Sequence, residues 1–91
     1  MIATGGRPRG HPAIPQELTL TSDDLFSLDK DPGNTLVIGG GYIAIECAGF
    51  LNGLGKQVSM INRSTFLRSM DADIGSRIVD DMVKSGVNAL T

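Results

Sequence analysis

Apolar residues recur with two different spacings after residue 34, and these spacings predict alternating strands and helices. Thr35–Ile38 is a short, mostly apolar run of the kind found in buried parallel strands, and it leads directly into three consecutive glycines. After the glycines, apolar side chains recur every three or four positions, as on one face of a helix, and Gly55 is a natural end for that helix. The residues that we expect on its buried face are Ile43, Cys47, Phe50, Leu51 and Leu54.

The alternation of strand and helix continues through the rest of the sequence. Val58–Ile61 is a second strand candidate, and it follows the first helix after a connection of ordinary length. A second helix is predicted over residues 72–85, with Gly86 as its end, and Val87–Leu90 begins a third strand. This order of elements predicts the α/β class, with a partial Rossmann-like βαβ unit over residues 35–91.

The first third of the chain has no such pattern. All four prolines fall within it, and proline disfavours helix both at its own position and at the preceding residue. Only residues 21–26 resemble a short helical turn, for which Thr21 or Ser22 is a suitable N-cap. We therefore divide the chain into an irregular segment, residues 1–34, and an α/β segment, residues 35–91.

The composition excludes several classes of function. The chain has 91 residues, 41% of them hydrophobic, and its net charge of −2 offers no attraction to nucleic acid or to an anionic membrane. It shows neither a signal peptide nor an apolar run near the roughly 20 residues of a membrane span, which favours an intracellular or organellar place, cytoplasmic or mitochondrial. With one cysteine, Cys47, and one histidine, His11, it can form neither an internal disulfide nor a Cys/His metal cluster.

The three glycines fit a phosphate-binding turn. Residues 39–44, GGGYIA, match the pattern G-x-G-x-x-[GA], between a predicted strand and a predicted helix. Gly39 would allow the tight turn, Gly41 would let a pyrophosphate approach the backbone, and Ala44 would let the helix pack closely on the strands. Gly40 occupies a position where glycine is permitted but not required. A glycine-rich loop that only turns the chain is the alternative, but the surrounding strand and helix favour a dinucleotide site.

The end of the second predicted strand distinguishes NADP from NAD. Proteins that bind NAD usually place an acid there for the ribose 2′-hydroxyl, but this sequence has Ile61 and Asn62. Arg63, Ser64 and Arg68 follow in one loop and offer two guanidinium groups and a hydroxyl, which suit a 2′-phosphate. The sequence therefore favours NADPH.

Several stretches resemble the FAD- and NADPH-dependent pyridine nucleotide–disulfide oxidoreductases. Residues 3–8, ATGGRP, are similar to the signature that ends a strand of that family's FAD-binding domain. Residues 21–28, TSDDLFSL, resemble the crossover into the NADPH-binding domain, and residues 36–55 with 63–71 resemble the NADPH site. The resemblance implies that residues 1–34 end an FAD-binding domain and that residues 35–91 open an NADPH-binding Rossmann domain.

The resemblance also implies roles for single residues. Tyr42 would be a gate, a ring that lies over the flavin and swings aside for the nicotinamide, and Glu46 would lie beside the flavin and the nicotinamide. Cys47 would not be a redox cysteine but a small buried residue. The cofactor-binding residues implied by the motif and the resemblance together are Gly39, Gly41, Tyr42, Ile43, Glu46, Arg63, Ser64 and Arg68.

Other parts that the resemblance implies are absent from these residues. The sequence has no flavin-binding GxGxxG near its start, no CxxxxC redox pair and no C-terminal His-Glu region. We therefore expect an interior piece of a homodimeric enzyme that passes electrons from NADPH through FAD to a disulfide, and we expect the piece alone to be inactive.

The substrate has two candidates within the family. The stretch ECAGFL and the spacing R-S-x-x-L-R favour the large, animal-type thioredoxin reductases, with thioredoxin as the protein partner, over the glutathione reductases. A free-standing, non-catalytic nucleotide-binding module is the alternative from another class. The proline-rich first third argues against such a module, because it has little to bury on its own.

Overall fold

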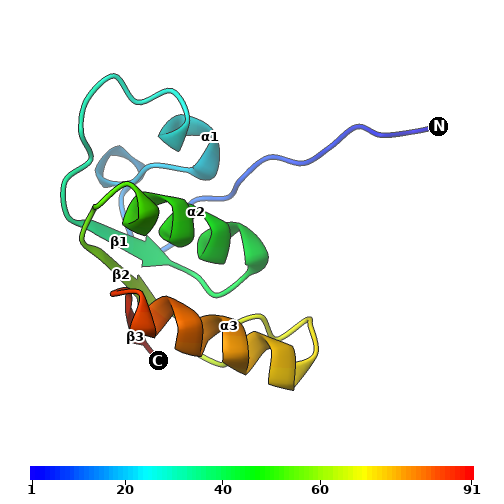
Figure 1. Cartoon of the computed structure of the whole chain (residues 1–91). Coiled ribbons are helices and arrows are strands. Elements are labelled where there is room, and N and C mark those ends of the chain that lie inside the picture. The colour runs from blue at the N-terminus through cyan, green and yellow to red at the C-terminus, as the bar shows by residue number, and fades with distance from the viewer. The chain divides into compact units, whose positions relative to one another are not determined.

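The computed structural model describes all residues, 1–91, and they form two compact units, Met1–Asp31 and Pro32–Thr91. The second unit holds a sheet of three parallel strands in the order β1-β2-β3. Its strands and helices are β1 (Thr35–Ile38), α2 (Tyr42–Gly53), β2 (Val58–Ile61), α3 (Ala72–Lys84) and β3 (Asn88–Leu90) (Figure 1). The predicted α/β class and the alternation of strand and helix are confirmed.

Both helices of the second unit end in the same glycine motif. Gly55 follows α2 and Gly86 follows α3, with φ of +79° and +107°. After each glycine the next amide donates back to the carbonyl five residues earlier, from Lys56 to Leu51 and from Val87 to Met82, both at 3.0 Å. This is the Schellman arrangement, and it satisfies carbonyls that the helix leaves free. Because the amide of Val87 closes α3, strand β3 begins one residue later than predicted, at Asn88.

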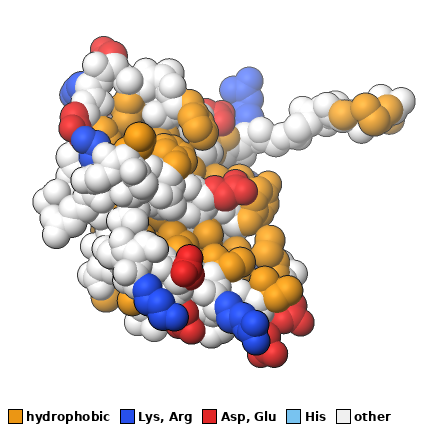
Figure 2. Space-filling view, viewed as in Figure 1, with side chains coloured by type: hydrophobic (Ala, Val, Ile, Leu, Met, Phe, Trp, Pro, Cys, Tyr) orange, Lys and Arg blue, Asp and Glu red, His pale blue; other side chains and the backbone are white.

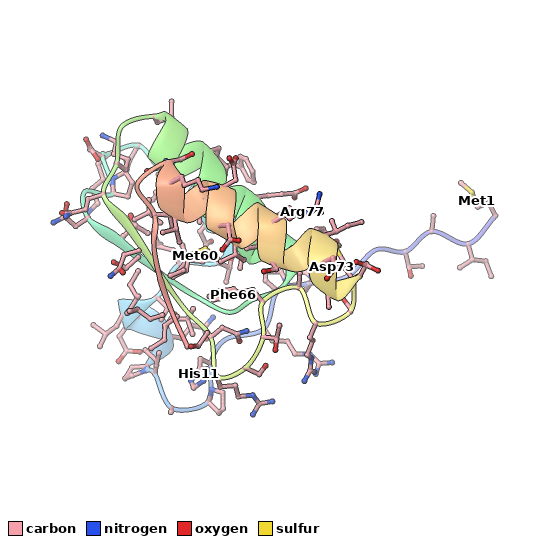
Figure 3. The ribbon with its side chains drawn as sticks, turned by 60° about the horizontal axis from the view of Figure 1, so that its bottom comes forward. Met1, His11, Met60, Phe66, Asp73 and Arg77 are labelled. Carbon is pink, nitrogen blue, oxygen red and sulfur yellow. The ribbon has the colours of Figure 1, made fainter.

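The core is small and is centred on the middle strand. Val58 and Met60 of β2 are fully buried, since β2 has a neighbour on each side and a helix above it. Phe66, in the loop before α3, lies beside that helix (Figure 3). The full set of buried apolar residues is Cys47, Ala48, Leu51, Val58, Met60, Phe66, Leu67 and Val87.

The predicted buried face of α2 was wrong at both ends. Ile43 is 47% exposed and Leu54 is 69% exposed, whereas Ala48, which the pattern left out, is completely buried. Apolar side chains occur on more than one side of this helix, so spacing alone does not identify the side that meets the sheet. The buried side of the helix centres on Cys47, Ala48 and Leu51.

Within the second unit, helices cover one face of the sheet. Successive residues of a strand point to opposite faces, so the row that contains buried Met60 faces the helices and the row that contains Ile61 faces away. Ile38, Ile61 and Leu90 lie side by side in register on that second face, and each is exposed. A doubly wound sheet carries layers on both faces, and the helices of the second unit supply one of them.

The first unit is irregular, as predicted. It contains a 3-10 turn at Gln16–Leu18 and one short helix, α1 (Ser22–Leu25), and none of its residues is buried. Thr21, one of the two expected caps, accepts a hydrogen bond from the amide of Asp24, and the Asp24 carboxylate accepts from the amide of Thr21. No helix of either unit has the length and apolar character needed to cross a membrane.

Candidate dinucleotide site

The turn between β1 and α2 is built by glycine. Gly39 has φ of +129°, a conformation that residues with a side chain rarely adopt, so the turn role predicted for it agrees with its backbone. Its amide donates to the Ile61 carbonyl at 2.9 Å, which continues the sheet pairing to the last residue before the turn. A Cβ on Gly39 would lie 3.8 Å from Cβ of Ala44, an ordinary contact, so here conformation rather than space requires glycine.

Gly41 leaves the start of α2 open. It is the N-cap residue, no side chain caps this helix, and its first turn holds no acid. A Cβ on Gly41 would meet nothing within 4 Å, so a ligand could approach the backbone there. Free amides together with the positive end of the helix dipole suit an anion such as a pyrophosphate.

The prediction that glycine is permitted but not required at position 40 was wrong. A Cβ on Gly40 would lie 2.6 Å from Cγ of Asn62, and closer still to its Nδ2. The carbonyl of Gly40 also accepts a hydrogen bond of 2.6 Å from the amide of Leu67. Both partners lie in the loop after β2, far away in the sequence, and no local pattern of the glycine motif indicates them.

The loop between β2 and α3 is stabilised by hydrogen bonds from one of its own side chains, that of Asn62. The Nδ2 group of Asn62 donates to the carbonyls of Ser64 at 2.9 Å and Thr65 at 3.1 Å, and the amide of Asn62 donates to Leu90 at 3.0 Å. Leu67 is buried, and it is the one residue other than glycine with positive φ, +52°. Asn62 and Leu67 are therefore the two residues that shape this loop, and neither was predicted from the sequence to have a role in it.

The loop ends where α3 begins. The Asp71 carboxylate accepts from the amides of Asp73 at 3.0 Å and Ile74 at 3.2 Å, which caps the helix. A Cβ on Gly75, one turn further on, would already touch Cβ of Leu67 at 3.4 Å. The first turn of α3 therefore presses on the loop and leaves little room for it to move.

The structure brings both candidate phosphate contacts to one edge of the sheet. The glycine turn follows β1 and the arginine loop follows β2, whose last residues, Ile38 and Ile61, are paired neighbours. Ligands of open parallel sheets bind at this carboxyl edge. Arg63, Ser64 and Arg68 are all exposed there, on a loop bonded directly to the glycine turn.

The candidate residues of α2 lie on its exposed side. Tyr42 and Glu46 are four residues apart and so share a face, and both are exposed, as is Ile43. Cys47 is buried, as expected. Burial, and then the charge of Glu46, raise the pKa of the Cys47 thiol, which disfavours the reactive thiolate. No cluster of three or more potential metal ligands occurs among the 91 residues.

Hollows mark the surface of the second unit in at least two places. One, of about 440 Å³, lies beside Ser64 and is lined mainly by the loop and by α3. The other, of about 390 Å³, lies between α2 and α3, away from the candidate residues. Figure 2 shows apolar side chains gathered between these two helices, and they include Ile45, Ile74 and Met82. The candidate phosphate-binding residues therefore lie on an open edge rather than in a closed cavity.

Comparison with known proteins identifies the family. The profile of the family described as pyridine nucleotide-disulphide oxidoreductase matches residues 1–91. The chain belongs to this family. The resemblance inferred from the sequence motifs is confirmed.

Family members with high similarity are thioredoxin reductases. The chain is 45% identical over 89 residues to "Thioredoxin reductase 2, mitochondrial" of Drosophila melanogaster, covering 96% of this chain and 17% of that protein. It is 47% identical over 89 residues to the thioredoxin reductase of Plasmodium falciparum (isolate FCH-5), covering 96% of this chain and 16% of that protein. The chain thus spans about one sixth of the length of these relatives.

A solved structure of a flavoprotein disulfide reductase shares the fold. It is the Cu(II) complex of the HOCl-induced flavoprotein disulfide reductase RclA from Escherichia coli, with a TM-score of 0.73 and 30% identity. The match covers 91% of this chain and 20% of that one. The α/β arrangement described above therefore occurs within a flavoprotein disulfide reductase.

Proposed function

We propose that this chain carries the NADPH-binding segment of a thioredoxin reductase-type enzyme. The observation that carries the proposal is the placement of an open helix start, at Gly41, beside an exposed loop with two arginines and a serine. The space beside Gly41 and the chemistry of the loop both fit a dinucleotide with an extra phosphate.

Each group would hold a different part of the nucleotide. The backbone at Gly39 and Gly41 and the helix start at Tyr42 and Ile43 would bind the pyrophosphate, which needs donors but no side chain. Arg63, Ser64 and Arg68 would bind the 2′-phosphate, the group that NADH lacks. When bound, NADPH supplies a hydride.

Tyr42 and Glu46 would face the reacting rings. Both are exposed on one side of α2, directly after the turn that would hold the pyrophosphate. We assign Tyr42 as the gate over the flavin of FAD and Glu46 as its neighbour, on the basis of the family resemblance. Residues 1–34 would form the end of the FAD-binding domain and the crossover into the NADPH-binding domain, residues 35–91.

The rest of the proposal concerns the whole enzyme. Its disulfide substrate would be thioredoxin rather than glutathione, because the family members reported above carry the name thioredoxin reductase. We propose a homodimer in the cytoplasm or the mitochondrion, the latter being the compartment named for the Drosophila relative. Neither nucleic acid nor membrane is a proposed partner, since the net charge of −2 attracts neither.

The test compares two nucleotides that differ only in the 2′-phosphate. Adenosine 2′,5′-bisphosphate and 5′-AMP are titrated by calorimetry into the chain and into the variant Arg63→Ala/Arg68→Ala. We expect the variant to lose at least about a hundredfold in affinity for the bisphosphate, since two arginines are removed and hydrogen bonds to charged groups each contribute about 1.5–3 kcal/mol. Affinity for 5′-AMP should stay the same.

The test also includes a matched control variant and a measurement in a whole enzyme. Arg77→Ala removes an arginine of α3 outside the loop and should leave both affinities unchanged. The double variant is also placed in the Drosophila thioredoxin reductase whose matching segment is replaced by this chain, where KM for NADPH should rise far more than KM for NADH. Equal losses for both nucleotides would reject the assignment.

A further inference from the structure

We infer that Gly40 and Asn62 form a positioning pair that controls selectivity for the 2′-phosphate. This inference rests on the proposed function, because it assumes that Arg63, Ser64 and Arg68 bind that phosphate. It states that Gly40, a residue of the glycine turn, affects the conformation of the loop between β2 and α3. Neither Gly40 nor Asn62 is itself a proposed contact of the nucleotide.

The first step is the absence of space between the two residues. A Cβ on Gly40 would lie 2.6 Å from Cγ of Asn62 and 3.2 Å from its Cβ, so it would overlap the base of the side chain and not only its tip. Gly40 has an ordinary negative φ and is thus required by the close approach of Asn62 rather than by its conformation. Asn62 fills the place that a side chain at position 40 would take.

The second step is that Asn62 cannot turn aside without cost. Its Nδ2 group has two hydrogens, and it donates to two carbonyls, those of Ser64 and Thr65. Its own amide donates to the Leu90 carbonyl in the neighbouring strand, which fixes the backbone from which the side chain extends. Any displacement of the side chain therefore breaks the bonds that fold the loop back on itself.

The third step is that Gly40 cannot withdraw either. Its carbonyl accepts the 2.6 Å bond from Leu67, and the adjacent amide of Gly39 donates to Ile61. Leu67 in turn is buried and touches the place where a Cβ of Gly75 would lie. The clash that a methyl group at position 40 would cause is thus relieved by moving Asn62, because Asn62 is the partner with a rotatable side chain.

The consequence falls on the arginine loop. Arg63 lies between Asn62 and the Ser64 carbonyl that Asn62 holds, so losing that bond frees the backbone of Arg63 and Ser64, two of the three residues proposed for the 2′-phosphate. The glycines proposed for the pyrophosphate keep their conformation, since the positive φ of Gly39 and the open space at Gly41 do not depend on Asn62. A substitution of Gly40, in the glycine turn, should therefore weaken recognition of the 2′-phosphate, although the turn itself is proposed to hold the pyrophosphate.

The experiment is a double-mutant cycle read by nucleotide selectivity. The chain and the variants Gly40→Ala, Asn62→Ala and Gly40→Ala/Asn62→Ala are titrated with adenosine 2′,5′-bisphosphate and with 5′-AMP. Each single variant should lower the ratio of the two affinities by about tenfold, the equivalent of two lost hydrogen bonds. The double variant should be close to Asn62→Ala alone, because the contacts with the amide group are gone and the remaining Cβ–Cβ contact of 3.2 Å needs a shift of only a few tenths of an ångström.

Controls separate this effect from general damage. Gly41→Ala obstructs the helix start and should weaken both nucleotides alike, leaving the ratio unchanged. If Gly40→Ala prevents folding, as seen in the NMR amide spectrum, Asn62→Ala creates no clash and carries the test by itself. In the Drosophila chimaera, Gly40→Ala and Asn62→Ala should raise KM for NADPH and leave KM for NADH unchanged.

Two results overturn the inference. Losses that are equal for both nucleotides, or additive losses in the double variant, would show that Gly40 and Asn62 act separately or only on stability. The proposed function fails in a different way: the unsubstituted chain would then bind the two nucleotides equally. The two failures are therefore distinguishable in one set of titrations.

Discussion

Asn52 of α2 donates a hydrogen bond of 3.1 Å from its Nδ2 group to the carbonyl of Ser85, the last cap residue of α3. The same side chain lies beside the glycine motif that ends α3, since a Cβ on Gly86 would be 3.7 Å from Oδ1 of Asn52. A carbonyl at the end of a helix has no partner within the helix. Asn52 provides that partner and ties the ends of the two helices together.

Replacing this donor by an acceptor should destabilise the second unit. In Asn52→Asp the shape is kept, but a carboxylate then faces a carbonyl near the negative ends of two helices. We expect the free energy of unfolding at neutral pH to fall by about 2 kcal/mol, from a lost hydrogen bond and an unfavourable charge. Urea unfolding measures this, with Asn88→Asp on exposed β3 as the matched control.

The pH dependence of that variant gives a second check. The unfavourable site raises the pKa of the new carboxyl group above its unfolded value of roughly 4. An acid whose folded pKa is raised destabilises the fold above that pKa, and the penalty disappears as the pH falls through it, when the protonated group can donate again. A loss that persists unchanged at pH 3 would contradict the hydrogen-bond explanation.

Cys47 should react slowly although it is the one thiol of the chain. Burial, followed by the charge of Glu46, raises its pKa, so at pH 7 to 8 less thiolate is present than for an ordinary cysteine of pKa about 8.5. We expect a thiol reagent to modify the folded chain at least about tenfold more slowly than the chain in urea. Glu46→Gln should speed the reaction much less than unfolding does, because burial is the larger cause. Equal rates for folded and unfolded chains would contradict this assignment.

The parts that the sequence predicts well are those encoded by neighbouring residues. The limits of β1, β2 and α3 follow from apolar runs and from glycines that stop helices, and these signals lie within a few positions of the elements that they define. The turn at Gly39 is predictable for the same reason. Even the late start of β3 is a local effect, since the amide of Val87 is used by the helix before it.

The parts that the sequence does not predict depend on contacts between distant segments. From the sequence alone, glycine looks optional at position 40. The residue that excludes a side chain there is Asn62, which comes close only when β1 and β2 pair. The side of α2 that meets the sheet is likewise decided by tertiary packing, and Ala48 is buried although its side chain is small. In the candidate site, sequence motifs therefore indicate the residues that would meet the ligand but not those that hold them in place.

Leu67 combines a backbone conformation that favours glycine with a side chain that the core requires. Its φ is +52°, its side chain is 3% exposed, and its amide bonds to Gly40. The left-handed conformation costs a residue with a side chain roughly 1–2 kcal/mol, and glycine avoids this cost. Leu67→Ala should lose about 2–5 kcal/mol of stability, because it removes buried atoms and keeps the strained backbone. Leu67→Gly loses one methyl group more, but glycine relieves the backbone strain. It should therefore be at least as stable as Leu67→Ala.

Leu51 of α2 provides the matched comparison, since it is equally buried, 3% exposed, but lies within a right-handed helix. There glycine relieves no strain and is worse than alanine by about 1 kcal/mol through helix propensity, so Leu51→Gly should be clearly less stable than Leu51→Ala. The four variants are compared by urea unfolding under one set of conditions. The order of alanine and glycine should reverse between the two positions. The same order at both would mean that the backbone at Leu67 is not strained, and that side-chain burial alone holds the arginine loop against the glycine turn.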